Sequence, residues 1–395
     1  MLTVDARSLH QALDQVRRIV TRRTVTRRAT TLPLRSVRCE CGGGALTLTT
    51  TGYNTDAWIT AQIDCQGDID PCCVPLQVLR SLPRSGEVAM FRVHDGKIGI
   101  SHGSMVILVQ PAEAEFPEPP VINPLPDVIT LSRKDVTDLA SLTGFTCRDA
   151  SRQALTGIYV RGNTAAATDT HRLAMAELTC RDLPEVIIPR RVIEVLDALV
   201  PRTGQDVEFT KDGTHVAFKW AGTAITTKTI EGPYAKYGEK KMMGLDVVGT
   251  VRYPRNELMT ALRQFATAGV GRSSGHTMIT PQDGAMRLNS QSPDCNITHH
   301  VRAEIEGDVL PMAWNHHYLL DAAAFLGSSE WCEMQITGDW SQAYMRNNNR
   351  TMVLMPQSPP YQVPTSKDAT TCADHAPESR VPAAAGAHGG CHGLD

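Results

Sequence analysis

The chain has 395 residues and carries 39 Lys and Arg residues against 42 Asp and Glu residues, for a formal net charge of −3. Hydrophobic residues make up 42% of it, which is enough for packed cores and excludes wholesale disorder, and the length predicts two or three domains. A net charge this close to zero argues against a generally basic nucleic-acid-binding surface, although basic residues can still gather on one face.

The sequence also bears on the cell compartment. It contains no run of 18 apolar residues, so we predict no membrane-spanning helix. The N-terminal segment contains Asp5 and Asp14 and lacks the apolar core of a secretion signal. The 11 cysteines form no C-x-x-C pair, which argues against a zinc site and favours reduced thiols. We therefore expect a cytoplasmic protein without a bound metal or cofactor.

Apolar residues at helical spacing first appear near the N-terminus and then recur twice. Residues 7–20 place leucine and valine side chains on one face of a predicted helix. Residues 133–145 and 255–266 repeat this pattern, and each of the three segments follows a short strand-like run. The segments begin at residues 7, 133 and 255, which are 126 and 122 residues apart. This spacing indicates an internal repeat.

A second predicted helix recurs at a similar interval, at residues 74–82, 188–200 and 315–327. A strand-turn-strand hairpin with Asp-Gly or Gly-Asp at its turn follows each of these helices, at residues 88–103, 207–222 and 332–347. The pattern predicts an α+β fold made of three copies of one unit, each with two helices and antiparallel sheets. We place the units at residues 1–122, 128–244 and 245–362, followed by a disordered tail at 363–395.

Arginine is concentrated after the first predicted helix. Between Asp14 and Glu40 the sequence has no acidic residue and eight arginines. Such a density of like charge costs self-repulsion and usually faces an anion. Basic residues recur at comparable places in the later units, so the pattern favours sequence-independent contact with nucleic-acid phosphates. The residues that we predict to bind DNA are Arg22, Arg23, Arg28, Arg80, Arg152 and Arg191.

One short cluster has the composition of a catalytic site. Asp169 and His171 lie close enough in sequence for an acid–base pair. No nucleophile elbow or second carboxylate motif accompanies them. The glycines at 42–44 lack a following Lys-Ser or Lys-Thr and predict a hairpin turn, not a phosphate-binding loop. A hydrolase that uses Asp169 and His171 remains an alternative from another functional class.

Several ordered motifs together resemble those of the bacterial DNA polymerase III beta subunit family, the DNA sliding clamps. The segment 167–174, ATDTHRLA, is similar to the family's ATDGHRLA signature. The resemblance covers residues 1 to about 356. The other motifs that carry it lie at 115–117, 149–157, 187–191, Asn315 with 318–321, and 354–356.

The resemblance implies three clamp domains per chain and a head-to-tail homodimer with helices inside and sheets outside. Such a ring would encircle duplex DNA, slide along it and tether the polymerase, as a non-catalytic subunit of the holoenzyme, and would be associated with the nucleoid. At the ring contact the family pairs aliphatic residues of the first and third domains. The corresponding positions here are Val106, Leu108, Thr267 and Ala268.

The resemblance also implies a pocket that receives short, largely hydrophobic peptides from the polymerase and the clamp loader. An apolar slot with a few polar anchors suits this task. Carried over by motif, the pocket residues are Leu155, Thr168, Thr170, His171, Arg172, Leu173, Ala235, Lys240, Asn315, Tyr318, Val353, Met355 and Pro356.

Departures from the family pattern concern the same regions. Thr170 stands where the family usually has Gly, so we expect the backbone angle of the turn to differ. Ala235 replaces a usual Pro, and Lys240 replaces a small aliphatic residue at the pocket edge. Thr267 and Ala268 are smaller than expected, and each lost methylene removes about 0.8 kcal/mol of burial, so the ring contact should be weaker.

These departures leave further alternatives. The chain could be an accessory clamp copy, carried by a plasmid or phage or kept as a drug-tolerant version. It could also be a monomeric DNA-binding scaffold, because its predicted dimer contact is thin. The family normally ends just after the Met-Pro pair, whereas this chain continues from Gln357. We hypothesise that this extension passes the mouth of the pocket and competes with partner peptides.

Overall fold

A computed structural model describes residues 1–20, 35–52, 56–93, 95–110, 116–123, 128–235, 246–270, 275–293 and 295–357. These residues belong to one unit, Met1–Gln357. Arg22, Arg23, Arg28, Lys240 and the predicted tail at 363–395 lie outside the described residues. The division into three domains therefore stays a prediction, although the order of helices and hairpins recurs as expected.

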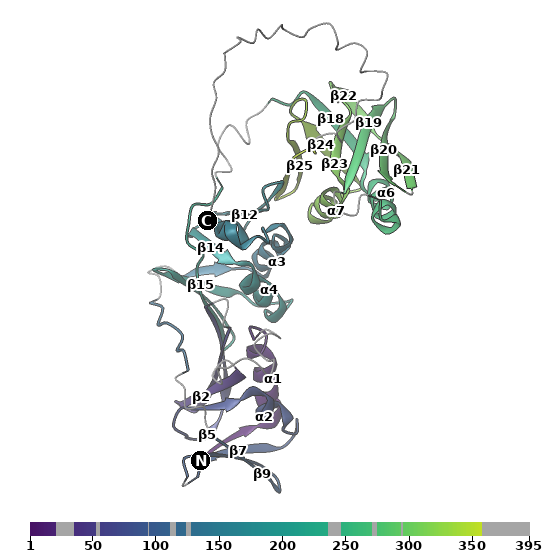
Figure 1. Cartoon of the computed structure of the whole chain (residues 1–395). Helices are drawn as coiled ribbons and strands as arrows, with labels where there is room; N and C mark the ends of the chain where they lie inside the picture. The colour runs from purple at the N-terminus through teal and green to yellow at the C-terminus, as the bar shows by residue number, and fades with distance from the viewer. Residues whose placement is uncertain are drawn as a thin grey trace, which may run out of the picture. The chain divides into compact units, whose positions relative to one another are not determined.

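The predicted helices are present and pack in pairs. Within each pair the two helices contact each other and lie beside strands (Figure 1). The first predicted helix ends four residues early, where Arg17 and Arg18 donate backbone hydrogen bonds in a tightened last turn. The pairs are α1 (Ala6–Val16) with α2 (Leu76–Ser81), α3 (Arg133–Ser141) with α4 (Arg190–Leu199), and α6 (Arg255–Ala268) with α7 (His316–Phe325).

Each helix starts where the sequence supplies a suitable residue. The Oδ2 atom of Asp5 accepts a hydrogen bond from the backbone N–H of Ser8, which caps α1. Ser132 and Asp135 form a reciprocal capping box at the start of α3. The helices α2, α4 and α6 begin directly after prolines, whose fixed φ angle suits a helix entry. These residues therefore fix where the helices begin.

Among the described residues the strands form four antiparallel sheets. The five-stranded sheet has the order β5 (Gln66–Gly67), β1 (Leu2–Asp5), β7 (Glu87–Arg92), β8 (Ile98–His102), β9 (Met105–Val109). The four-stranded sheet has the order β21 (Cys295–Arg302), β20 (Ala285–Ser292), β19 (His276–Gln282), β23 (Met312–Asn315). β9 and β21 therefore lie at sheet edges.

The two larger sheets each combine strands from two sequence repeats. The eight-stranded sheet has the order β10 (Ile129–Leu131), β15 (Val207–Asp212), β16 (His215–Trp220), β17 (Thr223–Lys228), β4 (Ala57–Asp64), β3 (Ala45–Gly52), β2 (Ser36–Gly42), β6 (Cys72–Pro75). The nine-stranded sheet has the order β14 (Leu183–Pro189), β11 (Gly157–Gly162), β12 (Thr164–Thr168), β13 (Arg172–Glu177), β26 (Arg350–Leu354), β25 (Ala343–Asn347), β24 (Trp331–Ile336), β18 (Gly249–Pro254), β22 (Glu304–Gly307). The pairs β4–β17 and β13–β26 thus join consecutive repeats by backbone hydrogen bonds.

The core is largely aliphatic, in a chain of which only 5% of the residues are aromatic. The buried faces of α1, α4 and α6 carry Leu, Val, Ile, Met and Ala side chains, together with Phe265 in α6, and α1 packs on β3 and β4. Each fully buried Leu, Val, Ile, Met or Phe side chain contributes about 1.5–3 kcal/mol of transfer free energy. Gly43 and Gly44 both have positive φ in the β2–β3 turn, which confirms the predicted hairpin. No helix in the described part of the chain is long and apolar enough to cross a membrane.

Candidate functional site

The turn between β12 and β13 is fixed by its own side chains. The Oδ1 atom of Asp169 accepts hydrogen bonds from the backbone N–H groups of His171 and Arg172, both at 3.1 Å. The hydroxyl of Thr168 donates to the carbonyl oxygen of Arg172 at 2.7 Å and accepts from the N–H of Thr170 at 3.1 Å. Five consecutive residues, 168–172, therefore form one rigid turn, which we name the 168–172 turn.

Thr170 occupies an unusual backbone position in this turn. Its φ is +80°, within the left-handed region that favours glycine. We expected threonine to change the angle of the turn; instead the chain keeps a glycine-like angle with a β-branched residue, which costs strain. The Nη1 atom of Arg152, in the 3₁₀ helix η3 (Ala150–Thr156), donates to the Thr170 hydroxyl at 2.9 Å. This contact brings two of the predicted site residues together.

Arg172 is the most connected side chain of the site and is only 8% exposed. Its Nε atom donates to Asp169 Oδ2 at 2.9 Å, and its Nη1 atom donates to Asp321 Oδ2, on α7, at 2.6 Å. The guanidinium carbon lies 4.8 Å from the ring centre of Phe145 and 4.3 Å from that of Tyr318. Two carboxylates and two aromatic rings thus hold the cation, which is how buried arginine charge is stabilised.

An apolar strip lies beside the turn, where β13 pairs with β26. Leu173 and Val353 are register partners across this strand pair and are both buried. The N–H of Met355 donates to the carbonyl oxygen of His171 at 3.0 Å, and the Met355 side chain is 41% exposed. An exposed methionine next to buried aliphatic residues gives an adaptable apolar surface. Pro356 and Leu155 are half-buried.

Helix α7 contributes the opposite side of the site. The Oδ1 atom of Asn315 accepts hydrogen bonds from the backbone N–H groups of His317 and Tyr318, at 2.9 and 3.3 Å, and so caps α7. The cap orients the first turn of the helix, and the Tyr318 ring stacks on the exposed ring of His171 with centroids 6.3 Å apart. Contacts therefore link the predicted residues of 168–172 with those of α7 and of β26.

The sequence prediction missed several residues of the apolar strip. Ala166, Met175 and Tyr344 are buried in one cluster with Leu173 and Val353. Met175 shares a strand face with Leu173, because residues two apart point the same way, so the alternation of β13 could have identified it. The cluster also contacts Tyr234, and no sequence signal indicates that contact.

Tyr234 anchors the segment that precedes Ala235. Its ring stacks on Tyr159 with centroids 4.9 Å apart, and its hydroxyl donates to the carbonyl oxygen of Ala166 at 3.3 Å. Burial raises the pKa of the Tyr234 phenol well above its usual value, so it remains a neutral donor. Ala235 itself is exposed.

Asp169 and His171 do not form an acid–base pair. The Asp169 carboxylate is engaged by the Arg172 side chain and by two backbone N–H groups. The imidazole of His171 instead faces Tyr318. Asp169 therefore acts as a turn-forming and charge-pairing residue, and the geometry gives a hydrolase no support.

The predicted DNA-binding arginines of the described part are not equivalent. Arg80 lies exposed in the last turn of α2. Arg191 lies exposed in the first turn of α4, pairs with Glu194 at 3.3 Å and donates to the carbonyl oxygen of Arg18 at 2.9 Å. Arg152 is bonded to the 168–172 turn. Arg80 and Arg191 thus sit on helices, whereas Arg152 belongs to the site described above.

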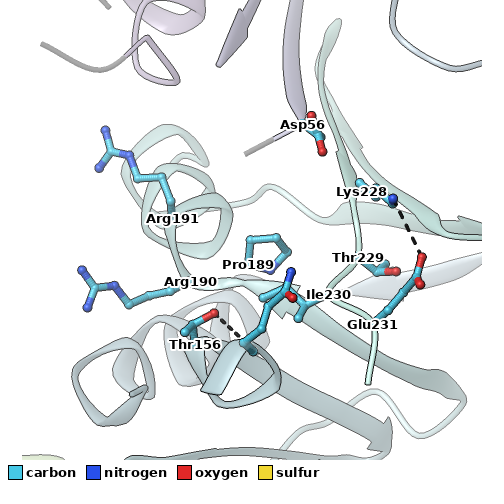
Figure 2. A pocket seen from close by; sticks show the side chains of 10 residues that line it. Asp56, Thr156, Pro189, Arg190, Arg191, Lys228, Thr229, Ile230 and Glu231 are labelled. Carbon is cyan, nitrogen blue, oxygen red and sulfur yellow. Dashed lines mark hydrogen bonds and ion pairs between the residues drawn. The ribbon is translucent and has the colours of Figure 1, made fainter. Parts of the chain in front are cut away.

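A surface pocket of about 490 Å³ beside the start of α4 was not predicted (Figure 2). Its lining includes Arg190, Arg191 and Lys228. Arg190 pairs with Glu194 at 3.1 Å, and Lys228 lies 3.9 Å from Glu231. In Figure 2 the two arginine side chains extend away from Lys228. The cations are paired and dispersed, so the pocket does not concentrate positive charge.

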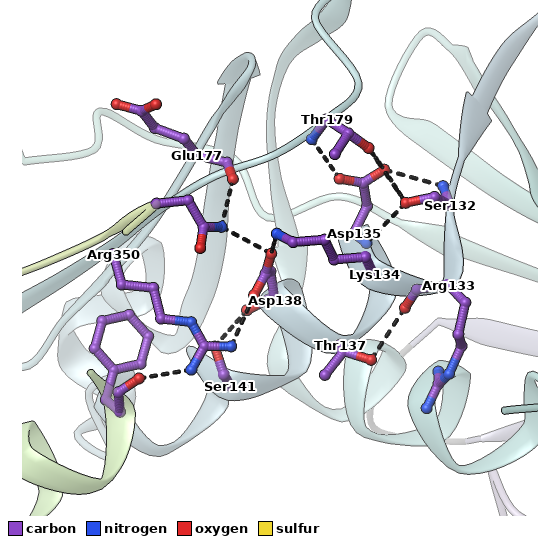
Figure 3. A network of polar contacts seen from close by, with 12 residues as sticks. Ser132, Arg133, Lys134, Asp135, Thr137, Asp138, Ser141, Glu177, Thr179 and Arg350 are labelled. Carbon is purple, nitrogen blue, oxygen red and sulfur yellow. Dashed lines mark hydrogen bonds and ion pairs between the residues drawn. The ribbon is translucent and has the colours of Figure 1, made fainter. Parts of the chain in front are cut away.

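A polar network joins α3 to the β25–β26 turn (Figure 3). The buried carboxylate of Asp138 accepts hydrogen bonds from Lys134 at 2.5 Å, Arg350 at 2.7 Å and Asn349 at 2.9 Å. Burial alone raises the pKa of Asp138, but these hydrogen bonds outweigh it and hold the pKa below its ordinary value. The network ties together segments more than 200 residues apart, next to the β13–β26 pair.

The predicted ring-contact residues are exposed, and they lie on or beside the edge strands of the two smaller sheets. Val106 and Leu108, on the edge strand β9, are 58% and 56% exposed. Thr267 and Ala268 are exposed in the last turn of α6, which packs against the edge strand β21. Two neighbouring aliphatic side chains on an open strand edge are unusual for a monomer, because such edges promote association.

Comparison with known proteins relates most of the chain to beta sliding clamps. The family described as DNA polymerase III beta subunit, central domain, matches residues 130–236. The chain is 25% identical over 346 residues to the beta sliding clamp of Synechococcus elongatus, covering 82% of this chain and 88% of that protein. It is 26% identical over 343 residues to the beta sliding clamp of Caulobacter vibrioides, covering 81% and 89%.

Solved structures show the same fold at lower identity. The DNA polymerase sliding clamp from Bacillus subtilis superposes with a TM-score of 0.80 at 18% identity, covering 91% of this chain and 99% of that one. The DNA polymerase III subunit beta from Pseudomonas aeruginosa gives a TM-score of 0.79 at 22% identity, covering 91% and 100%. The α+β fold predicted from the repeats is therefore confirmed over almost the full length of both structures.

Proposed function

We propose that the chain is a member of the DNA polymerase III beta subunit family, the beta sliding clamps, and that it encircles duplex DNA as a non-catalytic processivity factor. The observation that carries the proposal is the 25% identity to a beta sliding clamp over 82% of this chain and 88% of that protein, together with the same fold as solved sliding clamps. We assign residues 1–122, 128–244 and 245–362 to three clamp domains. The protein would act in DNA replication, in the cytoplasm and at the nucleoid.

Ring closure would use the two exposed sheet edges. We propose that β9 of one protomer meets β21 of its partner, head to tail, so that two chains form a closed homodimer. The exposed Val106 and Leu108 supply apolar area, and an unpaired strand edge supplies backbone hydrogen bonds. Thr267 and Ala268 would add little area, so we expect a ring that opens more readily than one with aliphatic residues there.

The inner wall would be formed by the helix pairs. Arg80 and Arg191 are exposed on α2 and α4, and Arg22, Arg23 and Arg28 follow α1 in the sequence. Contacts from these side chains to phosphates carry no base information, which suits sliding. Because Arg152 donates a hydrogen bond to Thr170, we assign it to the candidate site and not to the inner wall.

The candidate site would bind peptides of the polymerase and the clamp loader. The apolar strip of Leu173, Val353 and Met355 offers a hydrophobic slot, and the 168–172 turn with Tyr318 frames it. By the resemblance to the family we assign Ala235 and Lys240 to the edge of this slot, where they would affect which peptide sequences it binds. An accessory clamp copy is a second candidate, because Thr170, in the turn that frames this slot, stands where the family usually has glycine and keeps a left-handed φ.

The test of the proposed function is topological. The chain is loaded on a nicked circular plasmid by its clamp loader, and the plasmid is then linearised by a restriction enzyme. We expect the protein to stay on the circular DNA and to leave the linear DNA through its ends. Proteins bound at both ends of the linear DNA should lower this rate of dissociation. Retention on unblocked linear DNA would contradict encirclement. A fluorescent peptide from the host polymerase then separates the principal from the accessory copy, which would fail to bind it.

A further inference from the structure

Two cysteines at one end of the eight-stranded sheet lie in direct contact. The Sγ atom of Cys41, near the end of β2, lies 3.1 Å from the Sγ atom of Cys65, the residue after β4. The backbone fixes this approach, because the N–H of Cys65 donates to the carbonyl oxygen of Gly44 in the β2–β3 turn at 2.9 Å. A disulfide bond is ~2.05 Å long, so a shift of about 1 Å would join the two sulfurs.

The pair is accessible from solvent. Both cysteines are half-buried, and Cys65 lines a surface pocket of about 570 Å³. The same pocket is lined by three carboxylates, those of Asp5, Asp64 and Glu87. A second close pair in this region, Cys39 and Cys72, consists of register partners on β2 and β6 that are both buried. Only the first of these two pairs therefore combines sulfur contact with an entry route.

We propose that Cys41 and Cys65 form a redox-active dithiol that a small neutral peroxide oxidises to a disulfide. The site is independent of the proposed clamp function, since it depends only on the geometry of the first sheet. The Cys41 thiol also donates a weak hydrogen bond to the carbonyl oxygen of Gly67 at 3.5 Å, which holds its sulfur beside Cys65.

The oxidation balances with hydrogen peroxide as the sole oxidant. The Cys41 thiolate attacks one peroxide oxygen, an S–O bond forms, the O–O bond breaks, and the hydroxide that leaves takes up a proton to become water. Cys65 then loses its proton and attacks the Cys41 sulfur, so that the S–S bond forms, the S–O bond breaks, and the leaving hydroxide takes up the proton to become a second water. Two thiols are oxidised by two electrons in total, and one peroxide is reduced to two waters.

The order of the two attacks follows from the environment of Cys65. Burial, followed by the hydrogen bond with Cys41, raises the pKa of Cys65 to about 12. Cys65 therefore keeps its proton near neutral pH, and we assign the first attack to its neighbour Cys41. Once the Cys41 sulfur carries oxygen and no negative charge, a Cys65 thiolate no longer lies beside a second negative charge, so Cys65 loses its proton more easily.

The charge of the pocket selects the class of oxidant. Glutathione disulfide carries net negative charge and would approach three carboxylates, which lowers its local concentration. Hydrogen peroxide is neutral and small, and the disulfide cystamine is cationic. We therefore expect peroxide and cystamine to oxidise the pair faster than glutathione disulfide at equal concentration.

The disulfide would restrain the connection between the eight-stranded and the five-stranded sheet. Cys65 lies where the chain leaves β4 of the eight-stranded sheet and enters β5, which pairs with β1 of the five-stranded sheet. A cross-link to Cys41 closes a loop with a sequence separation of 24 residues. Closing such a loop restricts the unfolded chain and stabilises the fold, so the oxidised protein should melt about 3–6 °C higher than the reduced one.

The experiment maps the bond in the full chain. Purified reduced protein is treated with hydrogen peroxide, cystamine or glutathione disulfide at pH 7, free thiols are alkylated, and the chain is cleaved at Asp and Glu residues. Cleavage on the N-terminal side of these residues separates 40–55, 64–67 and 70–86, whose cysteines one tryptic fragment would retain together. We expect a cross-linked product of 40–55 with 64–67 that is 2 Da lighter than the sum of its parts, formed about tenfold faster with peroxide than with glutathione disulfide.

Variants separate this site from general thiol oxidation. Cys41→Ser and Cys65→Ser should each abolish the cross-link and the rise in melting temperature, whereas Cys295→Ser should retain both. Stable sulfinic acid at Cys41 or Cys65 without a cross-link would overturn the proposal. Equal cross-linking of Cys39 with Cys72, or equal rates with glutathione disulfide and peroxide, would overturn the assigned access route and oxidant class.

Discussion

The Nη1 atom of Arg172 donates a hydrogen bond of 2.6 Å to the Oδ2 atom of Asp321, and this contact joins the 168–172 turn to α7 across the β13–β26 pair. The two partners differ in exposure, since the Arg172 side chain is 8% exposed and that of Asp321 is 54% exposed. The arginine is therefore held from several sides, and the aspartate is a peripheral partner. This asymmetry predicts unequal effects of removing each residue.

Arg172→Ala should lower the free energy of unfolding by about 3–5 kcal/mol, because it leaves Asp169 without its buried partner. Asp321→Ala should lower it by only about 0.2–1 kcal/mol, because exposed ion pairs are screened by water. Urea unfolding of both variants at pH 7 measures the difference. Comparable losses for the two variants would contradict the role of Arg172 as the central residue of the site.

Thr170→Gly should make the chain more stable. The left-handed φ destabilises a non-glycine residue by about 1–2 kcal/mol, and glycine relieves this strain. Glycine also loses more backbone entropy on folding, which offsets about 0.5–1 kcal/mol of that gain. The net gain of about 0.5–1 kcal/mol is measurable by urea unfolding. As a matched control, Thr250→Gly in strand β18 has no strain to relieve and should destabilise the chain. Loss of stability in both variants would argue against strain at Thr170.

Local structure could be predicted from the sequence because its signals are local. The helix pairs follow from the spacing of apolar residues, and the β2–β3 turn follows from Gly43 and Gly44. The pairing of β4 with β17 sets Ile59 opposite Ile225, a contact between residues far apart in sequence. Nothing in the pattern of either strand selects the other as its partner, so the two sheets that combine strands of two repeats could not be predicted.

The candidate site shows the same limit. Resemblance to the family supplied the 168–172 turn and Met355, and contacts in the structure connect them. The bridging role of Arg172 was not predictable, because it requires Asp321 to lie across a strand pair that the sequence does not indicate. Tyr234 was missed for the same physical reason, since its contact with Ala166 spans 68 residues.

The Asp138 network should make stability depend on acid pH. The pKa of Asp138 is below its ordinary value of 3.8 in the folded chain, so its contribution is fully present above that value and is lost as the pH falls through the lowered pKa. Asp138→Asn leaves Arg350 without its buried carboxylate partner and should cost about 3 kcal/mol at pH 7. The difference between wild type and variant in urea unfolding should shrink below pH 4. A difference that stays constant from pH 7 to pH 2.5 would contradict this linkage.

Leu108→Lys should weaken the proposed ring. The substitution places a charge on the exposed edge of β9, where burial in a dimer would leave it desolvated and unpaired. We expect the dimer dissociation constant to rise about 30–100-fold, which corresponds to about 2–3 kcal/mol, in sedimentation equilibrium.

Val121→Lys is the matched control, because Val121 is also an exposed apolar residue, at 89%, but lies outside every strand. This control should leave the dimer constant within about twofold of wild type, since it removes no contact at a sheet edge. Both lysines add the same charge, so general repulsion between two chains would affect the two variants alike. If β9 lies at the subunit contact, the Leu108→Lys variant should have the higher dissociation constant of the two. Equal dissociation constants would place the subunit contact elsewhere.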